Sequence, residues 1–142
     1  MRLFIFLLLL FYSKLIVSSI LLGLILVIHF VHYKSFNFID IEKFVEFHKF
    51  HTKNISFLVI PLMIIEVVIS IIICYFYFSI LSLINLSLVA LIWITTFLLQ
   101  VPSHNKLSTG KSIAEIEKLV SGNVFRVYLW FFKAIVSTLI IL

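Results

Sequence analysis

The stretch that decides the fold is ISFLVIPLMIIEVVISIIIC, residues 55–74, in which Glu66 is the one charged residue. An apolar run of about 20 residues is long enough to cross the hydrocarbon core of a membrane as a helix. A lone ionised carboxylate is costly to bury there, so Glu66 is expected to be protonated, paired or functional. The stretch therefore predicts a membrane helix that carries an acidic group deep inside the protein.

The composition of the whole chain indicates a membrane protein. Hydrophobic residues make up 63% of the 142 residues and charged residues 12%, against about 45–50% and about 25% in soluble domains. A single domain of this length needs lipid to cover so much apolar surface. The one cysteine, Cys74, excludes a disulfide within these residues.

The net charge of +5 does not indicate a nucleic-acid partner. The basic residues are scattered through short polar segments and form no continuous face, which a nucleic-acid-binding protein needs. We therefore expect the lipid bilayer, and no nucleic acid, as the partner of this chain.

Four long apolar runs predict an all-α membrane protein, a four-helix bundle in one domain, with spans at about 9–33, 55–78, 80–101 and 124–142. The turn between the second and third spans is expected around 79–82, and Pro102 is expected to end the third. A signal peptide is the less favoured interpretation of the first run, because the run is too long and no A-x-A-like cleavage site follows it.

Two polar segments, 34–53 and 103–123, separate the spans and hold seven lysines. Arg2 and Lys14 are the basic residues expected on the opposite side, so the positive-inside rule predicts that both segments lie in the cytoplasm and both termini outside. Each segment has a short amphipathic pattern. We expect short interfacial helices there, with Asp40 and Ser112 as their N-caps.

Glu66 and Lys133 are expected to form an ion pair inside the membrane. Counted from the cytoplasmic ends of their spans, they lie roughly 16 and 14 Å deep at 1.5 Å per residue. Pairing is the simplest way to satisfy two opposite charges at similar depth, with Trp130 or Gln100 as a further hydrogen-bond donor. The pair would either support a function or only hold the helices in register.

Polar stripes mark the inward faces of two spans. Arg126, Trp130 and Lys133 recur at helical spacing on the fourth span, and Trp93, Thr96, Gln100 and His104 do so on the third. Side chains that form hydrogen bonds belong between helices rather than in lipid.

All five histidines are expected near the lysine-rich side of the membrane. We predict that His32, His48, His51 and His104 approach closely enough to bind a transition metal or haem, or to relay protons. No H-E-x-x-H, E-x-x-H or C-x-x-C-H motif supports a named metal site. The alternative is that each histidine bonds to lipid headgroups or to the backbone at the interface.

The polar residues also form a recognisable series of motifs. The series comprises His32-Tyr33, Phe47-His48-Lys49-Phe50-His51-Thr52, Pro61 with Glu66, Trp93, Thr96, Gln100-Val101-Pro102-Ser103-His104, Leu107, Gly110, Leu119-Val120, Asn123, Arg126, Trp130 and Lys133.

Over about residues 29 to 134 the chain resembles an uncharacterised family of small bacterial inner-membrane proteins with four spans. It departs from the family at Lys34, where proline is usual, and at Lys133, where arginine is usual. Lysine keeps the positive charge there but lacks the planar fork of arginine. The resemblance implies a four-span fold and this residue set, and it implies no particular reaction.

Two functional hypotheses follow, and neither settles whether the chain is an enzyme. The first is a membrane redox protein, or a metal- or haem-binding protein, with His32, His48, His51 and His104 as ligands. The second is a non-catalytic accessory subunit or small transporter, forming a homo-oligomer or joining a partner subunit, whose polar residues hold the bundle together.

Overall fold

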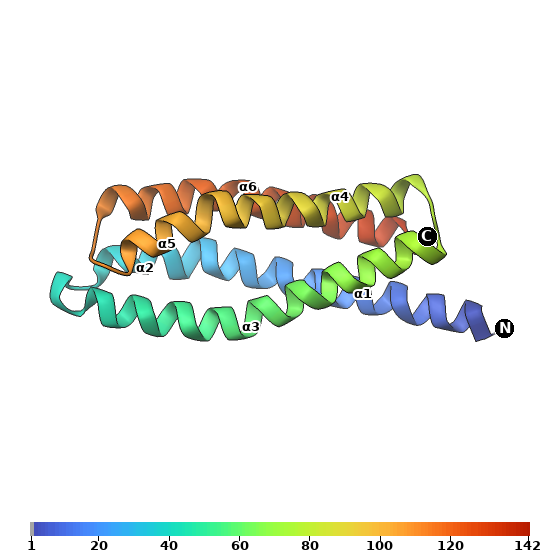
Figure 1. Cartoon of the computed structure of the whole chain (residues 1–142), viewed down its shortest axis with the longest axis horizontal. Helices are drawn as coiled ribbons and strands as arrows, with labels where there is room; N and C mark the ends of the chain where they lie inside the picture. The colour runs from blue at the N-terminus through green and yellow to red at the C-terminus, as the bar shows by residue number, and fades with distance from the viewer. Residues whose placement is uncertain (1) are drawn as a thin grey trace.

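The computed structural model describes the backbone of residues 2–142 and the side chains of residues 5–142. In this part of the chain the fold is an all-α four-helix bundle (Figure 1). Four helical stretches are long and apolar enough to cross a membrane: Ile5–Phe38, Ile41–Phe76, Ile80–Leu107 and Ile113–Leu139. The predicted fold class is therefore confirmed, and the chain is a multi-pass membrane protein in contact with lipid.

Two of the four stretches are uninterrupted helices and two contain a π-helical segment. The uninterrupted ones are α3 (Ile41–Phe76) and α6 (Ile113–Leu139). The first stretch consists of α1 (Arg2–Val27), the π segment η1 (Ile28–His32), α2 (Tyr33–Ser35) and the 3₁₀ turn η2 (Phe36–Phe38). The third consists of α4 (Ile80–Thr95), the π segment η3 (Thr96–Gln100) and α5 (Val101–Leu107).

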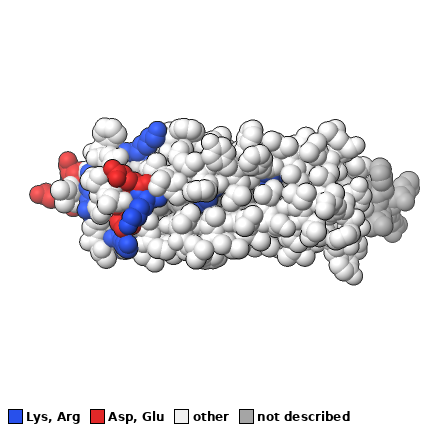
Figure 2. Space-filling view, turned by 90° about the horizontal axis from the view of Figure 1, so that it is seen from above, with Lys and Arg blue, Asp and Glu red and all other residues white. Residues whose placement is uncertain are grey.

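The helices alternate in direction around a common axis. Helix α1 packs against α3 and α6, and α4 packs against the same two helices, so α3 and α6 face each other across the bundle. Both termini and the α3–α4 turn lie at one end of the molecule (Figure 1). The other two connections lie at the opposite end, where the exposed charged side chains gather (Figure 2).

The prediction of separate interfacial helices is wrong. Residues 41–54 are the first turns of α3, and residues 113–123 are the first turns of α6. Their apolar faces pack on each other in a buried cluster that contains Phe36, Phe44, Leu107, Ile116 and Leu119, instead of lying flat on lipid. At 1.5 Å per residue α3 is roughly 54 Å long, against about 30 Å of hydrocarbon, so the lysine-rich end projects beyond the membrane core.

Pro102 does not end the third helix, contrary to prediction. The helix continues to Leu107, and the π segment Thr96–Gln100 ends two residues before the proline. Proline lacks an amide hydrogen and collides with the carbonyl four residues earlier in a regular α-helix. The wider π turn provides room for the ring, so the chain stays helical through this position.

The helix ends agree with most of the expected signals. Helix α4 begins with a capping box between Ser79 and Ser82. The turn between α3 and α4 therefore lies at residues 77–79, slightly before the predicted position around 79–82. The hydroxyl of Ser112 accepts a hydrogen bond from the Glu115 amide and caps α6. Asp40 occupies the N-cap position of α3, but its side chain makes no capping hydrogen bond.

Replacing Phe44 by alanine should destabilise the protein by about 3 kcal/mol, the lower end of the range for deleting a buried phenylalanine. Phe44 is fully buried between the extended ends of the helices, whereas Phe38 is 86% exposed at the same end. Reversible unfolding in detergent would measure both substitutions, with Phe38→Ala as the control. Equal, small effects would mean that the extended ends do not pack on each other.

Candidate functional site

Three charged side chains meet in the middle of the bundle. Glu66 from α3 forms an ion pair with Lys133 from α6, and the Nζ atom of Lys14 in α1 lies 3.8 Å from the Glu66 Oε1 atom. Glu66 and Lys133 are 0% exposed and Lys14 is 1% exposed. The structure thus brings the predicted pair together and adds a second amine to it.

Serine and asparagine side chains complete this central layer. Ser18 Oγ donates to Glu66 Oε1 at 3.1 Å and accepts from Lys133 Nζ at 2.8 Å. Lys14 Nζ donates to Ser70 Oγ at 2.9 Å. Asn85 of α4 donates to Ser137 Oγ of α6 at 3.0 Å. All four membrane helices therefore contribute to one buried hydrogen-bonded network, which such charges need in a low-dielectric interior.

Most of this layer was not predicted from the sequence. Lys14 was expected on the far side of the membrane, but it points into the bundle, where Glu66 and Ser70 satisfy its amine better than lipid would. A signal was available in the spacing, because each charge is followed by a serine one helical turn later. The three pairs are Lys14 with Ser18, Glu66 with Ser70, and Lys133 with Ser137.

Of the two donors expected to complete the ion pair, neither donates a hydrogen bond to it. Trp130 packs its ring face near Lys133, with 5.4 Å between Nζ and the ring centroid. This cation–π contact stabilises the ammonium without a hydrogen bond. Gln100 is buried elsewhere, with its amide against Gly122 of α6.

A second group of polar residues lies at the lysine-rich end of the bundle. His48 Nε2 is 3.0 Å from His104 Nδ1, and His104 Nε2 is 3.2 Å from the hydroxyl of Tyr33. Both ring nitrogens of His104 are therefore engaged in hydrogen bonds. A row of two imidazoles and a phenol can pass a proton along its hydrogen bonds.

The other histidine rings lie close to this row. The ring centroids of His32 and His51 are 5.2 Å apart, and those of His51 and His104 are 6.4 Å apart. Among residues 5–142 no group of three or more His, Cys, Asp or Glu side chains is arranged to hold a metal ion. Metal or haem binding by His32, His48, His51 and His104 stays a prediction, and His104 would have to give up a hydrogen bond to become a ligand.

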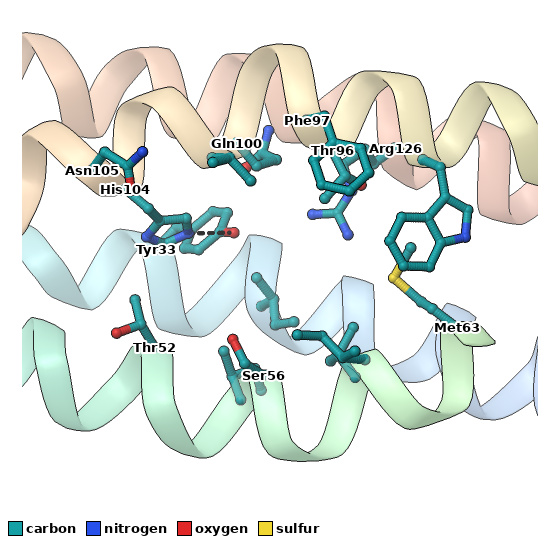
Figure 3. A pocket seen from close by; sticks show the side chains of 16 residues that line it. Tyr33, Thr52, Ser56, Met63, Thr96, Phe97, Gln100, His104, Asn105 and Arg126 are labelled. Atoms are coloured by element: carbon teal, nitrogen blue, oxygen red, sulfur yellow. Dashed lines mark hydrogen bonds between the residues drawn. The ribbon is translucent and has the colours of Figure 1, made fainter. Parts of the chain in front are cut away.

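Beside this row a cavity of about 260 Å³ opens between α3 and the third stretch of helix. One wall is apolar and includes Ile55, Val59 and Met63 of α3. The opposite wall carries the predicted stripe of span three, Trp93, Thr96, Gln100 and His104. Arg126 of α6 also lines the cavity. Figure 3 shows the guanidinium of Arg126 pointing into this space, on the same side as the Tyr33 hydroxyl.

The cavity wall contains buried polar atoms that have no hydrogen-bond partner among the described side chains, namely Arg126 Nε, Trp93 Nε1, and both polar atoms of the Gln100 amide. Arg126 is 5% exposed, and its Nη1 atom donates to Asn123 Oδ1 at 3.2 Å. The ion pairs of residues 5–142 all involve Glu66 or Glu115, so Arg126 has no carboxylate partner among them.

The two π-helical segments lie at the level of this cavity. Ile28 begins η1 and Tyr33 follows it, while Thr96, Phe97 and Gln100 belong to η3, and all five residues line the cavity. Single π turns inside α-helices occur frequently at functional sites, because the extra residue re-aims nearby side chains. The cavity is therefore the strongest candidate for a binding site in the described residues.

Comparisons with protein-family models, with curated proteins and with solved structures found no match for this chain.

The coupling free energy between Glu66 and Lys133 should exceed about 1 kcal/mol, the upper value for exposed ion pairs. The reason is that a buried charge that loses its partner is strongly destabilising. A double-mutant cycle of Glu66→Gln and Lys133→Met, read from unfolding in detergent, measures it. The cycle of Glu115→Gln with Lys118→Met, a pair whose lysine is 64% exposed, is the control. Additive effects at the central pair would show that the two charges do not interact.

Proposed function

We propose that this multi-pass membrane protein binds an anionic amphiphile, a molecule with an acidic head and an apolar tail, in the cavity beside Arg126. The observation that supports this most strongly is a buried guanidinium with no carboxylate partner among the described side chains, pointing into a cavity. A buried charge is normally paired, and a carboxylate or phosphate group is the partner that arginine binds best.

The remaining cavity wall fits the tail of such a ligand. Ile55, Val59 and Met63 supply apolar surface, and Phe97 and Ile60 at its edge are 57% and 46% exposed toward the lipid side of the helices. Ligand sites commonly combine apolar walls with a few placed polar groups. A ligand dissolved in the bilayer would reach Arg126 sideways, between α3 and η3, without crossing water.

The row of His48, His104 and Tyr33 gives the ligand head a route for protons. Tyr33 and His104 line the cavity, and His48 connects them toward the lysine-rich end. A weak acid that enters from lipid in its neutral form could pass its proton to this row and remain as an anion beside Arg126. Haem or metal binding by the histidines remains a second proposal, and an optical spectrum with metal analysis of the purified protein tests it.

Replacing Arg126 by methionine should weaken binding of a brominated fatty acid by about tenfold or more, because a hydrogen bond to a charged group contributes about 1.5–3 kcal/mol and about 1.4 kcal/mol corresponds to tenfold. Trp93 lines the cavity, so quenching of its fluorescence by bromine in a Trp130→Phe background reports occupancy. Brominated phosphatidylglycerol in place of the fatty acid distinguishes a phosphate head from a carboxylate.

The controls for this experiment are Lys118→Met, which removes an exposed cation from the same helix, and the methyl ester of the same fatty acid. Lys118→Met should leave the affinity unchanged, and the ester should bind more weakly than the acid. Equal quenching by acid and ester, or an unchanged affinity in Arg126→Met, would refute the proposed site.

We also propose that the lysine-rich end faces the cytoplasm of a bacterium, with the protein in the inner membrane, as the lysine asymmetry and the family resemblance suggest. In a Cys74→Ser background, Lys43→Cys should be protected from an impermeant thiol reagent added to intact cells, and Phe78→Cys should react. Phe78 is 76% exposed in the turn at the opposite end. The reverse pattern would invert the orientation.

A further inference from the structure

The central layer holds an unequal number of positive and negative groups. Two amines, from Lys14 and Lys133, face one carboxylate, from Glu66. With every group in its usual charge state the layer would carry a net charge of +1. No side chain in it is more than 1% exposed, so water does not screen that charge.

An unbalanced charge at this depth is unfavourable. Even the lowest estimates put a single charge at the centre of a membrane helix at about 2.5–3.5 kcal/mol. Releasing one proton from the layer removes the net charge, which is the usual response of a buried ionisable group without a partner. The question is which of the two amines releases it.

The contacts distinguish the two lysines. Lys133 forms the direct ion pair with Glu66, donates to Ser18 and lies near the face of Trp130, so three contacts stabilise its ammonium. Lys14 has one hydrogen bond, to Ser70, and lies 3.8 Å from the carboxylate. A neutral amine still has N–H groups to donate in that single bond, although it donates less strongly than an ammonium.

Among residues 5–142, Glu66 supplies the one carboxylate beside Lys14. Glu66 and the thiol of Cys74 face it from α3, and Lys133 faces it from α6. The residue that α4 supplies to this layer is Asn85, which is not ionisable. The Oε2 atom of Glu66 is buried without a hydrogen-bond partner, so one acceptor position in the layer is unused.

We infer that Lys14 is a proton-binding site in the centre of the membrane, neutral at rest, with the free Oε2 atom of Glu66 as the acceptor for the ammonium that it forms. On acidification the amine lone pair of Lys14 takes up one proton from a hydronium ion, which leaves as water. The ammonium then turns from Ser70 toward Glu66. Loss of the proton reverses both changes, and no electron transfer is involved.

The test is nitrogen-15 NMR of lysine-labelled protein in lipid nanodiscs, which separates amine from ammonium side chains. At neutral pH one lysine should give a neutral-amine signal, although an exposed lysine keeps its proton up to about pH 10.4. Lys14→Met should remove that signal, and Lys34→Met, which removes an exposed lysine at the charged end, should leave it in place. Acidification should convert the signal to the ammonium form.

A second variant keeps the test informative if Lys14→Met does not fold. Ser70→Ala removes the one hydrogen bond of Lys14, so it should move the pH at which the neutral-amine signal converts while leaving the other lysine signals unchanged. The inference is overturned if every lysine is an ammonium at neutral pH, if the neutral amine belongs to Lys133, or if Ser70→Ala leaves the conversion unchanged.

Discussion

The ion pair between Glu66 and Lys133 is the interaction on which the rest of the structure depends. It joins α3 to α6 across the diagonal of the bundle, so both side chains must extend through the centre. Burial of either charge alone would be strongly unfavourable, and together they fix the depth and rotation of both helices. Ser18 then ties α1 to this pair, and Asn85 ties α4 to α6 through Ser137.

The sequence predicted the class of fold and the central pair because those depend on local composition and on depth along a helix. Four apolar runs can satisfy their backbone groups in lipid only as helices, and Glu66 and Lys133 stand out in apolar surroundings. The helix ends were predicted less well. Pro102 was expected to end a helix, but the π turn before it accommodates the proline ring. Two segments were expected to form separate interfacial helices, but they are the first turns of α3 and α6, because they pack on each other around Phe44.

The cavity could not be predicted, because it depends on how the helices pack. The polar stripes contained four of the residues that line it, Trp93, Gln100, His104 and Arg126. Spacing alone does not distinguish a stripe that packs between helices from one that lines a cavity. The position of Lys14 was missed for a related reason, because a single lysine in a long apolar run is equally consistent with a buried position and with a position at the membrane interface. Both sites share the stripe of α6, with Arg126 at the cavity, Lys133 in the central layer and Trp130 between them.

The central claim is that a carboxylate from α3 meets an ammonium from α6 in the middle of the bundle. Solid-state NMR in lipid bilayers can measure it directly, from the dipolar coupling between the side-chain nitrogen of Lys133 and the carboxyl carbon of Glu66. If the two groups meet as described, a strong coupling is expected, which disappears in Lys133→Met and persists in Lys118→Met. A bilayer sample without that coupling, in which the rest of the helical spectrum is intact, would contradict the account.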